Sequence, residues 1–310
     1  MEMSNKPEGF FEIIDECHSL IESSGLVSEK SMALQAEPLP SLLEQCHAIT
    51  YQAEADEAPI RSIHHFACTG GTLFLKCLAS MPNTMTISEV EPHSRVVPLE
   101  ERRFSPTDWI GLVRASNRPL NDELVDALFY AGLDTLHDDC TMRGLHLVLR
   151  DHAHSHYCVG TQVAQQNNLR NLLSARPSTL SVVTVRHPLD SFLSLKSNNW
   201  LHFEPPTLDE YARRYQRFLS DHEDLPRFRY EKFVEDPQSE MTRLCEILEL
   251  TFNPDFIHFF DQYPLSGNSG RTSSTIGPRG RRPVPPDTDR LLSEATVFLA
   301  LCEDLGYDLN

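Results

Sequence analysis

The sequence predicts an α/β fold of three layers, in which helices cover both faces of a central, mostly parallel sheet. Two observations predict this class. From Ile60 onward, short apolar segments alternate with longer amphipathic ones, which is the order of strands joined by helical crossovers. The first apolar segment runs into glycines that precede an amphipathic segment, as in a strand-to-helix turn. With 310 residues, 40% of them hydrophobic, the chain is long enough to bury one large core.

The individual elements follow from local patterns. The predicted strands are short apolar runs, at 61–67, 84–88, 145–150 and 180–185. The predicted helices have apolar residues at helical spacing, or a proline at a first helical position, and fall at 71–80, 105–115, 121–135, 160–174, 188–199, 207–220, 237–248 and 287–305. The stretch from Ser266 to Pro286 has no periodicity and is rich in Gly, Pro and Arg, which predicts a long functional loop.

The chain is predicted to divide into an acidic helical extension, residues 1–59, and an α/β domain, residues 60–310. Helical spacing of apolar residues predicts two peripheral helices in the extension, joined by a turn at Pro38 and Pro40. Capping of the sheet is the simplest role for these helices. A dimer contact, which would make the protein a homodimer, and the binding of another partner stay open.

Charge and composition exclude several classes of function. The 27 basic and 45 acidic residues give a net charge of −18, which argues against non-specific binding to nucleic acid or to anionic lipid. No apolar stretch has the length of a membrane span, and the first residues lack the pattern of a signal peptide, so a cytoplasmic protein is expected. The eight cysteines lack the spacing of a zinc site or a disulfide framework.

The residues Cys68-Thr69-Gly70-Gly71-Thr72 have the build of an anion-binding loop. The two glycines permit positive φ and close approach of the backbone, and a helix that continues through Leu73 presents N–H groups to a phosphate. No Gly-Lys-Ser or Gly-Lys-Thr follows, which weighs against the metal-bridged chemistry of nucleotide hydrolases. The alternative interpretation is a plain strand-to-helix turn.

A second motif follows the predicted strand 180–185. Arg186 ends this strand, and the helix that begins near Pro188 carries Ser194 two turns further on. A guanidinium fork and a hydroxyl at one helix start suit a second phosphate. The alternative is that Arg186 pairs with Asp190 and that Ser194 is an exposed helical residue.

Together, the two motifs resemble those of the sulfotransferase family, whose members use 3′-phosphoadenosine 5′-phosphosulfate (PAPS) as donor. Residues 69–72 match the family's 5′-phosphosulfate loop, and Arg186 with Ser194 match its 3′-phosphate motif. Residues 229–237 resemble its Tyr-Glu strand before a late helix, and residues 267–271 its cofactor-closing loop. The resemblance implies a sulfotransferase fold similar to that of P-loop-containing nucleoside triphosphate hydrolases.

The resemblance also implies roles for residues. It implies that PAPS is bound, with no metal requirement, by Cys68, Thr69, Gly70, Gly71, Thr72, Leu73, Arg186, Ser194, Asn268 and Arg271. The family usually has Lys or Arg where this chain has Cys68, and that cation stabilises the charge on the bridging oxygen as the sulfuryl group leaves. A thiol cannot replace it. The predicted substitutes are His64 or His65, or the loop arginines Arg271, Arg279, Arg281 and Arg282.

Sulfuryl transfer also requires a base for the acceptor. His152 and His154 follow the predicted strand 145–150, where some sulfotransferases carry a catalytic histidine, and imidazole titrates near neutral pH. Glu89, after the second predicted strand, is the other candidate and is narrowly less favoured. As an alternative, the His-x-His-x-His pattern at 152–156 is also typical of a metal cluster.

The predicted function is sulfuryl transfer from PAPS to a hydroxyl or amine of a small molecule or carbohydrate. Specificity is expected to lie in the loops at 90–120, 150–160 and 200–206, and the acceptor itself is not readable from them. Two other classes stay open: a non-catalytic nucleotide-binding protein of the same fold and, less favoured, a nucleotide-dependent kinase.

Overall fold

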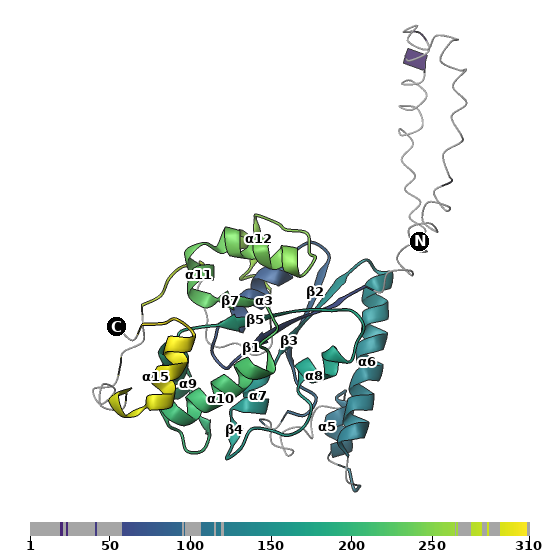
Figure 1. Ribbon diagram of the computed structural model, residues 1–310. Coiled ribbons are helices and arrows are strands. Elements are labelled where there is room, and N and C mark those ends of the chain that lie inside the picture. The colour runs from purple at the N-terminus through teal and green to yellow at the C-terminus, as the bar shows by residue number, and fades with distance from the viewer. Residues whose placement is uncertain are drawn as a thin grey trace, which may run out of the picture. The chain divides into compact units, whose positions relative to one another are not determined.

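A computed structural model describes part of the chain, namely residues 19–20, 23, 41, 58–94, 96, 107–114, 116–118, 121–263, 265, 274–280, 284 and 292–308. The chain divides into two units, Met1–Glu57 and Ala58–Asn310. The second unit contains the sheet and the helices described below (Figure 1). The two N-terminal helices predicted from the sequence fall almost wholly outside the described residues, and the boundary at residue 59 stays a prediction.

The second unit is built on five parallel strands in the order β2-β3-β1-β5-β7. Their bounds are β1 Ile60–His65, β2 Thr84–Val90, β3 His146–Asp151, β5 Thr179–Val185 and β7 Arg227–Arg229. A two-stranded sheet pairs β4 (Val159–Gly160) with β6 (His202–Phe203). The four predicted strands and the α/β class are confirmed. The strand β7 was not predicted, because Phe228 is its single apolar residue and gives no apolar run.

The helices follow the strands as expected of crossover connections. They are α3 Gly71–Ala79, α5 Trp109–Arg114, α6 Asp122–Met142, α7 Ala153–Tyr157, α8 Leu169–Ser174, α9 Pro188–Ser197, α10 Leu208–Asp221, α11 Tyr230–Glu235, α12 Pro237–Ile247, α13 Phe256–Phe259 and α15 Thr296–Asp304. Two predictions were wrong in detail. The helix predicted at 160–174 begins only at α8, where the Asn168 side chain accepts from the N–H of Asn171. The strand implied at Tyr230 is instead the start of α11.

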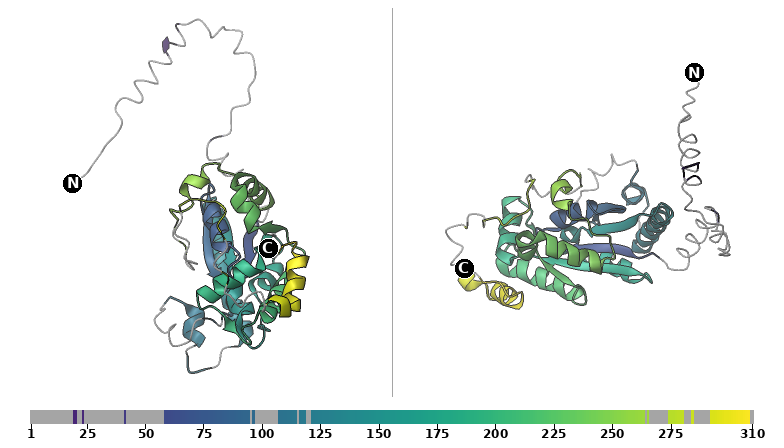
Figure 2. Two further views of the ribbon diagram at one scale, coloured as in Figure 1. Left: turned by 90° about the vertical axis from the view of Figure 1, so that its left-hand side faces the viewer. Right: turned by 90° about the horizontal axis from the view of Figure 1, so that it is seen from above.

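Helices cover both faces of the sheet (Figures 1 and 2). On one face, Ile63, Val148 and Val182 pack with residues of α3, α11 and α12. On the other face, Leu149 packs with residues of α6 and α8, and Val183 packs with residues of α9, α10 and α15. Adjacent strand residues therefore enter different cores, as the two-residue period of a strand requires.

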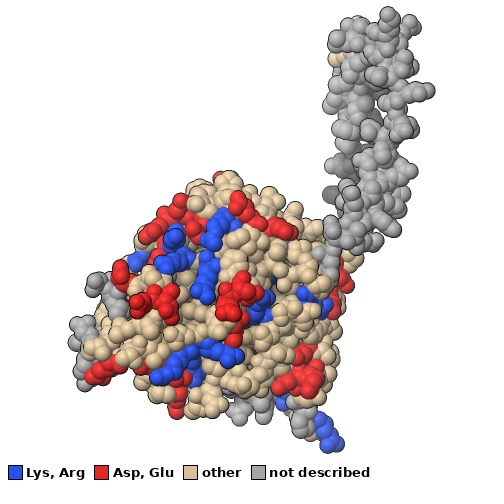
Figure 3. Space-filling model, viewed as in Figure 1, with Lys and Arg blue, Asp and Glu red and all other residues tan. Residues whose placement is uncertain are grey.

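On the face drawn in Figure 3, acidic and basic side chains are interspersed. Among the described helices, none combines the length with the apolar character that crossing a membrane demands.

Candidate functional site

A cavity of ≈ 500 Å³ lies at the carboxyl edge of the sheet, where parallel α/β folds bind their ligands. The segments that follow β1, β3 and β5 all contribute to it. Its lining consists of His65, Ala67, Cys68, Gly70, Gly71, Thr72, Leu73, Glu89, Val96, Arg150, His152, His154, Arg186, Ser194, Trp200, His202, Tyr230, Arg279 and Gly280. The structure therefore brings most of the predicted site residues together.

The loop after β1 needs its glycines for two different reasons. Gly70 caps α3 with φ 101°, and a Cβ there would lie 2.5 Å from the ring of Tyr230. Gly71 is the first helical residue, as predicted, and a Cβ there would overlap the ring of His65. Since the first N–H groups of a helix have no partner within the helix, the start of α3 is suited to an anion.

Thr69 is placed differently from its neighbours in the loop. Its side chain is fully buried, and its hydroxyl donates to the carbonyl of Phe66 at 2.7 Å. It is not part of the cavity lining. This threonine stabilises the turn itself, and its contact with a phosphosulfate stays a prediction.

The second motif reaches the first one directly. Nη1 of Arg186 donates to the carbonyl of Cys68 at 3.2 Å, and the guanidinium lies 4.8 Å from the ring centroid of Tyr230. Nε of Arg186 is buried and has no hydrogen-bond partner among the described residues. Ser194 lines the same cavity from α9. The two predicted anion-binding motifs thus form one continuous wall.

Arg150, a cation that was not among the predicted site residues, lies beside the loop. Its side chain is only 2% exposed. Nη1 donates to Nε2 of His65 at 3.1 Å and to Oγ1 of Thr72 at 3.3 Å, and Nε donates to Oγ of Ser88 at 2.8 Å. The guanidinium also forms an ion pair with Glu89. Burial lowers the pKa of Arg150, and the Glu89 carboxylate opposes that change.

His64 and His65, the histidines predicted to substitute for the missing loop cation, are neighbours in β1 and point to opposite faces of the sheet. His65 lines the cavity, whereas His64 lies outside its lining. The Nδ1–H of His65 donates to the Phe66 carbonyl at 3.1 Å, which leaves Nε2 to accept from Arg150. Burial and the charge of Arg150 hold the pKa of His65 well below 6.5. His65 is therefore neutral at pH 7 and cannot supply the positive charge.

The three candidate bases all line the cavity. Two of them, His152 and Glu89, contact each other, and the third, His154, contacts His202. Nε2 of His152 lies 3.2 Å from Oε2 of Glu89, and Nε2 of His154 lies 3.2 Å from Nδ1 of His202. Burial, together with the charges of His152 and His202, lowers the pKa of His154 to about 3. Glu89 adopts φ 62° at an irregularity in the pairing of β2 with β3, which places its carboxylate between Arg150 and His152.

The long C-terminal loop contributes to the cavity through Arg279 and Gly280. Its described stretch, 274–280, contains neither helix nor strand, as expected. Asn268 and Arg271, the residues predicted to close over the nucleotide, lie outside the described residues, as do Arg281 and Arg282.

Several lining residues were given no individual role from the sequence, among them Arg150, Trp200, His202 and Tyr230. For Arg150 a signal was present, because an arginine at the end of a buried strand must find polar partners. Trp200 and His202 lie within or beside the loop expected to set specificity.

The sequence was compared with curated proteins and with models of protein families. A search of curated proteins found no match. Residues 66–254 match the Sulfotransferase family, a range that contains both anion-binding motifs and covers more than half of the chain. On this match, and with an all-parallel α/β sheet consistent with it, the chain belongs to the sulfotransferase family, which is a family of enzymes.

Proposed function

We propose that this protein transfers a sulfuryl group from PAPS to a hydroxyl or amine of a small molecule or carbohydrate. The observation that carries the proposal is the shared cavity, in which the loop before α3 and the Arg186–Ser194 motif form one wall. In this assignment Gly70, Gly71 and Thr72 hold the 5′-phosphosulfate. Arg186 and Ser194 hold the 3′-phosphate.

The residues present fit a nucleotide with two separate anionic groups, a 3′-phosphate and a 5′-phosphosulfate. The buried Nε of Arg186, which has no hydrogen-bond partner among the described residues, is a donor that a phosphate oxygen would satisfy. The first N–H groups of α3, which have no partner within the helix, face this wall, and the helix dipole favours negative charge there. When bound, PAPS supplies an activated sulfuryl group whose leaving oxygen belongs to the 5′-phosphate.

Arg150 takes the place of the loop cation that Cys68 lacks. It is a permanent charge, it touches Thr72 in the first turn of α3, and it lines the cavity. In that position it stabilises the negative charge that develops on the leaving oxygen. The neutral His65 holds the guanidinium in place by accepting from Nη1.

His152 is the preferred base. Its side chain is 23% exposed, so it can meet an acceptor, and Glu89 at 3.2 Å orients its ring. With Nε2–H donating to Glu89, the lone pair of the ring is on Nδ1, the nitrogen that takes the proton from the acceptor group. Glu89 already contacts Arg150 as well, which suits a positioning role better than that of the base. The acceptor side of the cavity is lined by His154, Trp200 and His202.

Calorimetric titration with adenosine 3′,5′-bisphosphate tests this function. We expect micromolar binding to wild-type protein, and Arg186→Ala should weaken it by about 2 kcal/mol, or roughly 30-fold in Kd, because a charge-assisted contact is lost. Arg243→Ala on α12, which is not part of the cavity lining, is the matched control and should bind as wild type.

ATP serves as the competing ligand in the same titration. Failure of the bisphosphate to bind, or a preference for ATP with turnover that depends on Mg²⁺, would overturn the proposal in favour of a kinase. Tight binding of the bisphosphate without transfer to any of a panel of hydroxyl and amine acceptors would favour a non-catalytic nucleotide-binding protein.

A further inference from the structure

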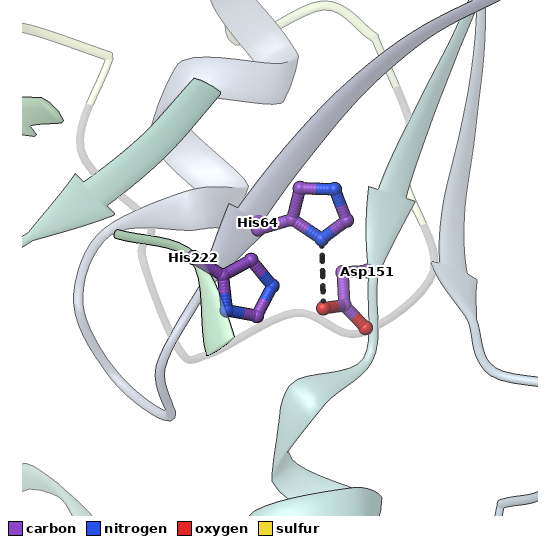
Figure 4. Close-up of side chains that lie close together, drawn as sticks. All are labelled: His64, Asp151 and His222. Atoms are coloured by element: carbon purple, nitrogen blue, oxygen red, sulfur yellow. Dashed lines mark hydrogen bonds and ion pairs between the residues drawn. The ribbon is translucent and has the colours of Figure 1, made fainter. Parts of the chain in front are cut away.

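A second cluster of polar side chains lies behind the candidate site, on the opposite face of the same strands. His64 near the end of β1, Asp151 at the end of β3 and His222 directly after α10 come together there (Figure 4). Their exposed fractions are 0%, 1% and 0%. None of the three lines the cavity described above.

Each residue offers one metal-ligating atom, and the three atoms lie within 4.8 Å of one another. Nδ1 of His64 and Oδ2 of Asp151 are 3.1 Å apart. The ring of His222 is turned towards these two atoms (Figure 4). Neighbouring ligand atoms around tetrahedral zinc are roughly 3.3 Å apart, so the spacing of His64 and Asp151 fits this geometry, and the His222 ring would move closer to this pair when an ion binds.

The hydrogen bonds around the histidines allow ligation through Nε2 of His222 and, in place of the present hydrogen bond with Asp151, through Nδ1 of His64. Nδ1–H of His222 donates to the carbonyl of Phe218 at 2.7 Å, so Nε2 carries the lone pair. Nε2 of His64 lies 2.9 Å from Oγ of Ser62, which lies 2.8 Å from Oγ of Ser181. If Nε2–H donates into this hydroxyl chain, Nδ1 of His64 is free to ligate. Such outer contacts are typical of metal-binding histidines.

Two of the buried ligand atoms have no hydrogen-bond partner among the described residues. They are Nε2 of His222 and Oδ1 of Asp151. Buried polar atoms are nearly always satisfied, and an orphaned one indicates a missing water or ion. A metal ion would satisfy both atoms at once if the Asp151 carboxylate bound through its two oxygens.

We propose that His64, Asp151 and His222 form a structural site for a divalent transition metal of the zinc type. Two imidazoles and a carboxylate are the mixed N/O donors that zinc accepts. The ion would fasten the ends of β1 and β3 to the end of α10, and so fix the strand ends from which His65 and Arg150 enter the cavity. It has no part in sulfuryl transfer.

This site differs from the metal interpretation considered for residues 152–156. That alternative depends on the spacing of His152, His154 and His156 in the sequence. The cluster proposed here combines residues from three separate segments. It also revises the expectation, drawn from the family resemblance, that the protein requires no metal.

The first test is the metal content of the wild-type protein, purified without chelator or metal-affinity resin and measured by plasma mass spectrometry. We expect about one equivalent of zinc per chain. After removal of the metal with a chelator, Zn²⁺ in excess should raise Tm by roughly 5–10 °C. Co²⁺ should give the visible absorption of a tetrahedral site with nitrogen and oxygen ligands.

Variants then locate the ion. His222→Phe keeps a ring of similar size without the nitrogen, and Asp151→Asn keeps the shape without the charge. Both should lose the metal. His154→Phe, in the neighbouring His-x-His-x-His segment, is the matched control and should keep it.

Two outcomes overturn the proposal. One is loss of metal in His154→Phe with retention in His222→Phe. Another is a wild-type protein that contains no metal and whose Tm does not respond to Zn²⁺ or Co²⁺, which would identify the cluster as a neutral trio with a protonated Asp151. Because this last outcome needs only wild-type protein, a variant that does not fold leaves the proposal testable, and no readout depends on sulfuryl transfer.

Discussion

The two faces of the strand ends, only one residue apart in sequence, differ sharply in their surroundings. On one face His65 and Arg150 enter the cavity, and on the other His64 and Asp151 are enclosed with His222. The residue types are alike on both faces, since each combines a histidine from β1 with a charged residue from β3. The two faces differ in their access to the cavity. Because successive side chains of a strand point to opposite faces, only one residue of each neighbouring pair can reach it.

Arg150 and Asp151 are both buried ionisable residues, but their surroundings differ. Arg150 is surrounded by Ser88, Glu89 and Thr72, so its charge is held in place and faces the cavity. Among the described residues, Asp151 has a single side-chain partner, His64, and burial raises its pKa well above the usual value. The first arrangement suits electrostatic work on a substrate, and the second suits either a metal ion or a neutral acid.

The largest expected effect comes from removing the cavity-facing charge. Arg150→Gln should reduce the rate of sulfuryl transfer by about 10²–10³-fold, because the developing charge on the leaving oxygen loses its main counter-charge. Single-turnover kinetics at saturating PAPS measure this rate. Asp151→Asn, on the opposite face, is the matched control and should retain a far larger share of the wild-type rate. Similar losses in both variants would contradict the division between the faces.

A smaller effect is expected from crowding the cavity face. Gly71→Ala places a Cβ against the enclosed ring of His65, and we expect a loss of about 1–3 kcal/mol in the free energy of unfolding. Gly132→Ala in α6 provides the control, since nothing lies within 4 Å of a Cβ there, and it should stabilise by up to about 1 kcal/mol. Urea unfolding measures both changes. Equal stability of Gly71→Ala and wild type would show that His65 moves freely.

The third effect concerns the pH dependence of stability. Because the pKa of His154 falls from 6.5 to about 3 on folding, the unfolded chain takes up a proton between these values and the folded chain does not. Stability is therefore lost as the pH falls from 6.5 towards 3, by about 1.4 kcal/mol per pH unit for this residue. His154→Gln should remove that part of the slope, whereas His258→Gln, at an exposed position, should not. Urea unfolding at several pH values measures the slope, and an unchanged slope in His154→Gln would contradict the assignment.

The sequence was sufficient for the elements that have strong local patterns. The strands β3 and β5 contain apolar runs, whereas β1 and β2 mix apolar with polar residues. The loop between Ala67 and Thr72 combines glycines with a following amphipathic helix, so it could be recognised locally. The short strand β7 has too little apolar character for this. The 160–174 prediction failed because periodicity was extended through a polar stretch that ends with the capping Asn168.

The site residues divide in the same way. Arg186 directly follows β5, and Ser194 lies in the next helix, α9. Because the two residues are close in sequence, their shared location could be predicted from the spacing. The role of Arg150 depends on its contacts with β2 and α3, which no local pattern contains. His222 is further out of reach, because it meets His64 and Asp151 only after α10 has packed on the sheet.

The contacts of Tyr230 have a consequence for how this site can change. Its ring limits residue 70 to glycine, the guanidinium of Arg186 lies over the ring, and Arg186 in turn donates to the carbonyl of Cys68. Substitution at any of these positions disturbs the others, so the loop and the distant arginine can be inherited or engineered only as a set. A graft of the glycine loop into another α/β protein should fail to transfer nucleotide binding unless the tyrosine and the arginine are transplanted with it.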